Sequence, residues 1–205
     1  MIKLLQYRIA WGEISPMAWL SGGALLVIAS DRLAHALIAA VALLWVYCLS
    51  PLAVHAGARI FPRQGRAALL AILVSFIACV FLFLLWILFP LCALKMFFII
   101  SFIPLIFLGS GNFQKLETLN LSEKFFTFFS EALIMGILLI IFSIIREPLG
   151  YSSLSLPGGT HGLIFLLSFE PGYIFPIHLA ASSSGALLLL GYFLGLYRIF
   201  MEKKQ

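Results

Sequence analysis

The sequence predicts an all-α integral membrane protein, with six transmembrane helices arranged as two inverted repeats of three helices each. Of its 205 residues, 63% are hydrophobic and only 10% are charged, whereas about a quarter of the residues of a soluble domain are charged. The apolar runs are long and do not alternate with polar residues, so they predict helices and not the strands of a membrane barrel. Two irregular runs occupy the same position in each half of the chain, which predicts the repeat.

Six apolar runs are the predicted spans, and residues 1–205 form a single membrane domain. A helix needs about 20 apolar residues to cross the hydrocarbon core of a bilayer. Four runs satisfy this requirement well: 33–54, 67–89, 126–145 and 177–199. The run 16–30 is shorter and contains Gly22 and Gly23, and the run 91–109 contains Pro104. We therefore expect the first and fourth spans to be short or broken.

The basic residues indicate the orientation of the spans, because Lys and Arg are enriched on the cytoplasmic side. With a cytoplasmic N-terminus, the basic residues on the inside are Lys3, Arg8, Arg59, Arg63, Arg66, Lys115, Lys124, Arg198, Lys203 and Lys204. Only Arg32 and Arg146 fall outside. Lys95 lies near the end of a span, where it either reaches the interface or lines a cavity. Both termini are therefore predicted to be cytoplasmic.

The two halves, 16–89 and 91–199, each contain three spans, so they face opposite ways across the membrane. The irregular span of each half ends in a turn of small and polar residues, "ALLVIASD" at 24–31 and "PLIFLGSG" at 104–111. Interrupted spans at matching positions of inverted halves point to a site near the middle of the membrane. The alternative is that the glycines and Pro104 serve helix packing or a kink.

Glu131 is the acidic residue that lies inside a predicted span, in "FTFFSEALIMG". A charge within the bilayer costs about 2.5 kcal/mol or more, so it should face protein, water or an ion. Glu131 is therefore a candidate ligand for a cation or a proton. The alternatives are that the headgroups hydrate it, or that it is protonated and hydrogen-bonded to a neighbouring helix.

Arg146 and Glu147 stand side by side where the fifth span is expected to end, because Pro148 and Gly150 follow them. The pair either anchors the helix at the membrane interface, caps the broken end of a neighbouring helix, or contacts another subunit. The loop 147–176 that follows contains "HGLIFLLSFEPGYIF". This stretch is too short to cross the membrane, and it is expected to lie in the interface or to re-enter the bilayer.

Several kinds of site are not predicted. Cys48, Cys79 and Cys92 lie in or beside apolar runs without a CxxC pair, which favours small apolar packing residues over metal ligands. The sequence has no GxSxG, HExxH or phosphate-binding glycine motif, so no catalytic residue is assigned. The formal charge of +5 is distributed as orienting charge, which argues against a nucleic-acid partner and leaves the lipid bilayer as the expected surroundings.

The closing stretch "SGALLLLGYFLGLYR" resembles the last helix of the Rnf/Nqr membrane subunits, small integral subunits of ion-translocating electron-transport complexes. That family typically has two prolines, a glycine and an alanine before the aliphatic run. Ser183 and Ser184 replace the prolines here, while Gly185, Ala186 and Gly191 match.

The stretch "IIREPLG" resembles the arginine–glutamate motif that closes the fifth helix of the same subunits, through Arg146, Glu147, Leu149 and Gly150. The resemblance covers most of the chain in layout and is specific in motif over the second half. It implies a subunit of the bacterial inner membrane that helps to pass electrons across the membrane, in a complex that couples redox chemistry to sodium or proton movement. Its partners would be other membrane subunits of that complex, including a homologous inverted partner.

In this family each half contributes a cysteine from its broken helix, and the subunit pair holds an iron–sulfur cluster. The alignment places Ala24 and Leu105 at the two cysteine positions, and neither side chain can bind iron. We therefore expect no iron–sulfur cluster from this chain alone. Two other functions stay open: a stand-alone secondary transporter with Glu131 as the ligand of the coupling ion, and a membrane scaffold without transport.

Overall fold

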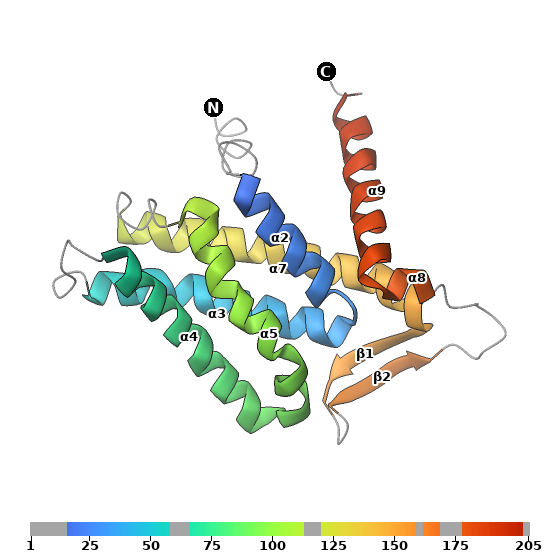
Figure 1. Cartoon of the computed structure of the whole chain (residues 1–205), viewed down its shortest axis with the longest axis horizontal. Helices are drawn as coiled ribbons and strands as arrows, with labels where there is room; N and C mark the ends of the chain where they lie inside the picture. Colours follow the sequence, from blue (N-terminus) through green and yellow to red (C-terminus); the bar gives the residue numbers. More distant parts are fainter. Residues whose placement is uncertain (1–15, 58–65, 113–119, 159–161, 169–177, 203–205) are drawn as a thin grey trace.

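The computed structural model describes residues 16–57, 66–112, 120–158, 162–168 and 178–202, which are mostly helical (Figure 1). The elements in chain order are α2 (Pro16–Ala29), α3 (Leu33–Gly57), α4 (Arg66–Leu88), α5 (Pro90–Phe107), the π-helical turn η1 (Leu108–Asn112), α7 (Leu121–Tyr151), β1 (Ser153–Pro157), β2 (Leu163–Ser168), α8 (His178–Ala181) and α9 (Ser183–Glu202). Four helical segments are long and apolar enough to cross a membrane: Leu33–Gly57, Ala68–Leu88, Pro90–Ser110 and Leu121–Tyr151. The described chain thus has the helices of a multi-pass membrane protein.

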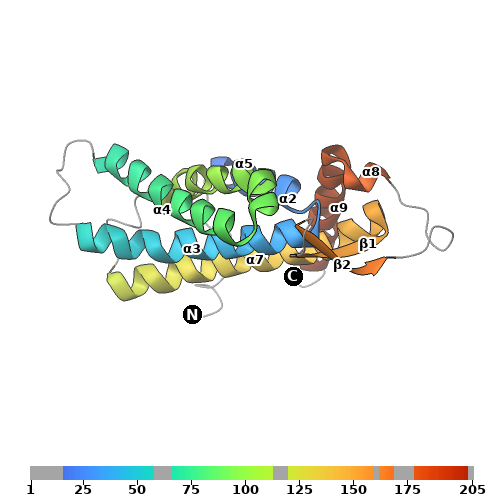
Figure 2. The ribbon, with the colours of Figure 1, turned by 90° about the horizontal axis from the view of Figure 1, so that it is seen from below.

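Helices α3 and α7 form the most extensive helix pair of the described structure. They run antiparallel, and Figure 2 shows α3 between α7 on one side and α2, α4 and α5 on the other. The two helices approach closely at Gly136, where an added Cβ would lie 3.2 Å from the Cβ of Ala40. Tyr47, Phe107 and Phe128 join α3, α5 and α7, with ring centroids of Tyr47 and Phe107 4.8 Å apart. This packed centre fixes the positions of the shorter helices around it.

The first and fourth spans differ from each other. Helix α2 has only 14 residues, in agreement with the expected short span. Helix α5 continues through Pro104, contrary to the expected interruption there, and is long enough to cross. A proline removes one backbone N–H from the helix, and the apolar packing of α5 on α3 and α4 tolerates that loss. The irregularity lies after Pro104 instead, in η1.

The last predicted span, 177–199, is divided at Ser182 into α8 and α9. The Ser182 hydroxyl donates to the carbonyl of Leu179 at 2.6 Å and accepts the N–H of Gly185 at 3.2 Å. It therefore closes the end of α8 and caps the start of α9, as serine does at helix N-termini. Both views show α9 crossing the direction of α3 and α7 steeply (Figures 1 and 2).

The segment expected to be an interfacial or re-entrant loop contains a two-stranded antiparallel sheet, so the all-α prediction is wrong in this detail. Helix α7 also runs through Pro148 and Gly150 to Tyr151, although these residues were expected to end it. Ser152, in the left-handed region with φ 51°, ends the helix instead. Gly150 lies so close to α8 that an added Cβ would be 2.9 Å from the Cβ of Ala181, which explains a glycine inside the last turn.

Candidate functional site

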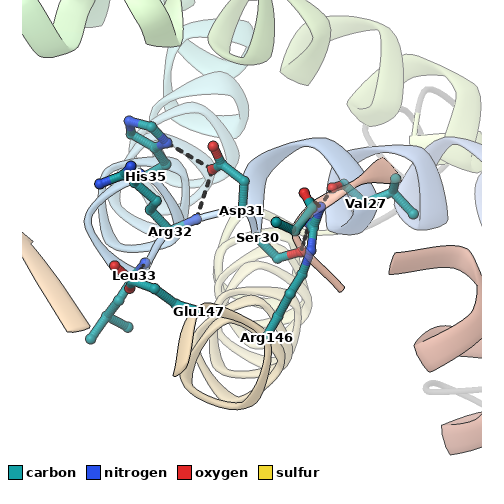
Figure 3. A network of polar contacts seen from close by, with 9 residues as sticks. Val27, Ser30, Asp31, Arg32, Leu33, His35, Arg146 and Glu147 are labelled. Atoms are coloured by element: carbon teal, nitrogen blue, oxygen red, sulfur yellow. Dashed lines mark hydrogen bonds and ion pairs between the residues drawn. The ribbon is translucent and has the colours of Figure 1, made fainter. Parts of the chain in front are cut away.

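The break between α2 and α3 lies beside the last turns of α7. Helix α2 ends at Ala29 and α3 begins at Leu33. The last carbonyls of a helix and its first N–H groups have no partner within the helix. Away from water, each of these groups needs another partner. Two neighbouring residues of α7, Arg146 and Glu147, supply those partners (Figure 3).

Arg146 is 2% exposed and uses its whole guanidinium group. It donates five hydrogen bonds of 2.7 to 3.1 Å, to the carbonyls of Val27, Ala180, Ala181 and Ser182 and to the hydroxyl of Ser30. An arginine has five N–H donors, so none is left over. The guanidinium therefore joins the C-terminal end of α2 to the C-terminal end of α8, where the partial charge of each helix is negative.

Glu147 holds a helix end of the opposite polarity. Its Oε2 atom accepts the backbone N–H of Leu33 at 2.7 Å, and the side chain is 0% exposed. Leu33 is the first residue of α3, where the helix dipole favours a negative charge. Successive residues of a helix point about 100° apart. This is why the two residues reach different helices. Both side chains are buried at helix ends, whereas a pair that anchors the helix at the membrane interface would be exposed.

A second polar group at the same break was not identified from the sequence. The Asp31 carboxylate accepts the N–H of Arg32 at 2.8 Å and lies 2.7 Å from Nδ1 of His35. The guanidinium of Arg32 lies over the ring of Tyr151, 4.7 Å from its centroid, and 5.9 Å from that of Phe165. Asp31 and His35, four residues apart at the start of an apolar run, are the pattern that would have revealed this contact.

The other candidate residues lie apart from this break. Glu131 is half-buried on α7, and 15 residues of helix place it about 22 Å from Arg146 at 1.5 Å per residue. It interacts electrostatically with Tyr47, which packs against Phe107 and Phe128. Lys95 is exposed on α5. The structure thus brings Arg146 and Glu147 together and leaves Glu131 and Lys95 elsewhere.

The two positions that the resemblance aligns with cluster cysteines, Ala24 and Leu105, lie on different helices. Ala24 is half-buried on α2, and Leu105 on α5 is 60% exposed. Within the described residues, no group of three or more His, Cys, Asp or Glu side chains is arranged to hold a metal ion. The thiols of Cys48, Cys79 and Cys92 are free, and Cys92 donates to the carbonyl of Gly162 at 2.8 Å, which ties the hairpin to α5.

No protein-family model matches the sequence, and no curated protein matches it.

Proposed function

We propose that this chain is a membrane subunit of an Rnf/Nqr-like electron-transport complex of the bacterial inner membrane, which couples redox chemistry to sodium or proton translocation. The observation that carries the proposal is the place of the "IIREPLG" stretch. Its Arg146 and Glu147 join the ends of three helices inside an apolar protein. The two residues that carry the resemblance in this stretch therefore hold helix ends together inside the protein. With Ala24 and Leu105 at the cysteine positions, the subunit would hold no cluster of its own.

The six-span inverted repeat belongs to the same proposal, and the two halves supply matching details. Helices α3 and α7 both carry an acidic or hydroxyl residue followed by Pro-Leu, at Ser50–Leu52 and Glu147–Leu149. The two helices are antiparallel and packed together, as inverted counterparts would be. Helix α2 would span jointly with the turn that follows it, and α9 would supply the sixth span.

The ends of α2 and η1 extend this correspondence. Ser30 follows α2 and Ser110 lies in η1, and each is preceded three residues earlier by a carbonyl that accepts a side-chain donor. Arg146 donates a hydrogen bond to the carbonyl of Val27 at 2.7 Å. The Ser110 hydroxyl donates a hydrogen bond to the carbonyl of Phe107 at 2.9 Å. One half thus closes its helix end with a charged residue of the other half, and the second half closes its own with a neutral hydroxyl.

In this role the chain performs no covalent chemistry. It supplies a rigid α3–α7 pair and interrupted helices whose polar ends lie inside the protein, which is the arrangement that membrane transporters use near their ion paths. The partners that carry electrons would bind to the apolar surfaces of the subunit, among them a homologous inverted partner.

Purification of the tagged chain from its native membranes, in a mild detergent, tests the proposal. We expect flavin-bearing membrane proteins to be recovered with it in fixed proportion, and redox-driven ion uptake to be lost in vesicles from cells that lack the chain. Arg146→Gln should abolish this recovery, whereas Lys124→Gln, which removes a charge from the other end of α7, should not. Purification of the chain alone, with solute accumulation in liposomes that Glu131→Gln abolishes, would instead establish a stand-alone transporter.

A further inference from the structure

We propose that the guanidinium of Arg32, which two aromatic rings hold in place, binds the phosphate of an anionic phospholipid where the α3–α7 pair reaches the membrane surface. The site lies at the break between α2 and α3, but it uses neither of the two side chains that join the helix ends there. It goes beyond the proposed function and does not depend on it, because any membrane that surrounds the chain supplies the ligand.

The side chain of Arg32 is positioned by rings from two other elements. Its guanidinium lies 4.7 Å from the ring centroid of Tyr151, the last residue of α7, and 5.9 Å from that of Phe165 in β2. Both distances are within the range of cation–π attraction. This attraction uses no hydrogen-bond acceptor, so the N–H donors of the guanidinium stay available for a ligand.

These donors have no acceptor in the part of the chain that the structure describes. No hydrogen bond or ion pair of the Arg32 guanidinium is formed there. The Asp31 carboxylate instead accepts the backbone N–H of Arg32 and lies 2.7 Å from Nδ1 of His35. Figure 3 shows the side chains of Arg32 and Arg146 on different sides of Asp31. Because Arg32 is only half-buried, an anion from outside the protein can reach its donors.

The ends of two spans identify that anion. Arg32 immediately precedes the span Leu33–Gly57, and Tyr151 is the last residue of the span Leu121–Tyr151. Since the two residues are in contact, the surface of the hydrocarbon core passes close to both of them. Phospholipid phosphates lie at that level, and the planar fork of an arginine fits two phosphate oxygens at once. The guanidinium is therefore placed to bind a lipid headgroup.

The hairpin beside Arg32 supplies an apolar surface for the rest of the lipid. Strand β1 packs against α3 and α7, and β2 pairs with β1. The residues 164–167 of β2 are all apolar, and each is 49–56% exposed. Successive side chains of a strand point to opposite faces, so both faces of β2 offer apolar contacts of the kind that insert into a membrane interface. Acyl chains can use this surface and free inorganic phosphate cannot, which favours a phospholipid as the ligand.

Titration of the delipidated full-length chain in detergent with phosphatidylglycerol, followed by native mass spectrometry, tests the site. We expect about one lipid per chain to bind more tightly than any further lipid. Arg32→Gln should weaken this binding about tenfold, because hydrogen bonds from an arginine to a phosphate are charge-assisted. Lys124→Gln is the control: it removes the same charge from the other end of α7 and should leave the affinity unchanged.

Two substitutions of Tyr151 test whether the ring positions Arg32. Tyr151→Leu keeps the apolar bulk but removes the aromatic face, and it should weaken phosphatidylglycerol binding about threefold. Tyr151→Phe keeps the ring and should bind the lipid like the unaltered chain. Equal binding by the leucine and phenylalanine variants would contradict the role of the ring.

The source and the charge of the phosphate are tested by competition. Inorganic phosphate should not displace phosphatidylglycerol, and phosphatidylcholine, whose ammonium group offsets its phosphate, should bind more weakly. The inference is overturned if Arg32→Gln binds phosphatidylglycerol as tightly as Lys124→Gln does. It is also overturned if inorganic phosphate displaces the lipid, which would identify a site for a soluble anion, or if phosphatidylcholine binds equally well.

Discussion

At the scale of single residues, the molecule depends on a buried arginine whose partners are mostly backbone carbonyls. Arg146 donates to four carbonyls and one hydroxyl from two separate parts of the chain. Charge-assisted hydrogen bonds of this kind are the stronger ones. The planar fork of arginine also lets one side chain reach both helix ends, which the single ammonium of lysine cannot do in the same geometry.

Replacing Arg146 should therefore be severely destabilising. Arg146→Leu leaves five oxygens without this donor, three of them in buried hydrogen bonds, and it removes the positive charge next to Glu147 in the sequence. We expect a loss of about 3–5 kcal/mol. Arg32→Leu removes the same charge from a half-buried position over Tyr151, and it should cost about 1 kcal/mol. The measurement is the unfolding free energy of both variants in detergent. Equal stability of the two variants would show that the five hydrogen bonds of Arg146 make no net contribution to the free energy of unfolding.

At the scale of elements, the interruptions between helices are stabilised by specific caps. The break between α8 and α9 depends on Ser182, whose hydroxyl contacts both Leu179 and Gly185. Gly185 is itself required there, because an added Cβ would collide with the carbonyl of Leu179. Such local chemistry turns a continuous apolar run into two helices with different directions.

Loss of the Ser182 hydroxyl should loosen the start of α9. Ser182→Ala removes the acceptor for the Gly185 N–H, and an N-cap of this type contributes about 1 kcal/mol. We expect faster amide hydrogen exchange in the first turn of α9, with α3 and α7 unchanged. Ser101→Ala, at an exposed position of α5, is the control. Exchange at α9 that is the same in both variants would mean that packing, and not the cap, fixes this break.

The contact between α3 and α7 supplies a second prediction at this scale. Gly136→Leu forces a large side chain into a position where even a Cβ lies 3.2 Å from Ala40. Overpacking of this kind costs about 1–3 kcal/mol. Gly191→Leu is a matched control, because nothing lies within 4 Å of a Cβ at that position. The thermal unfolding midpoint should fall for the first variant only, and a similar midpoint for both would contradict the close helix contact.

At the scale of the whole molecule, the sequence predicted a mostly helical chain and the positions of the four helices that are long and apolar enough to cross a membrane, because long apolar runs favour such helices. The predicted spans 33–54 and 67–89 agree closely with α3 and α4. Pro104 and Pro148 were misleading, because packing overrides the loss of one backbone hydrogen bond. At the break, Arg146 and Glu147 were recognised as candidates, but all their partners except the Ser30 hydroxyl are backbone atoms, which every residue carries. Their contacts therefore could not be predicted from residue type.

The antiparallel α3–α7 pair makes the topology testable. The end of α3 and the start of α7 lie at one end of the pair, so residues there should face the same side of the membrane. The distribution of basic residues predicts that this side faces the cytoplasm. His55 and Ser122 are exposed at this end, and Ser183 is exposed at the start of α9, near the other end of the pair.

Single cysteines at these three positions should report the arrangement, in a chain whose native Cys48, Cys79 and Cys92 are replaced by alanine. We expect a membrane-impermeant thiol reagent to label Ser183→Cys in intact cells, and His55→Cys and Ser122→Cys only in inverted vesicles. The unsubstituted cysteine-free chain should take up no label. Labelling of His55→Cys and Ser122→Cys from opposite sides would contradict a transmembrane antiparallel pair. Labelling of both from the outside would preserve the antiparallel pair. It would also show that the orientation of the pair is the reverse of the one that the basic residues predict.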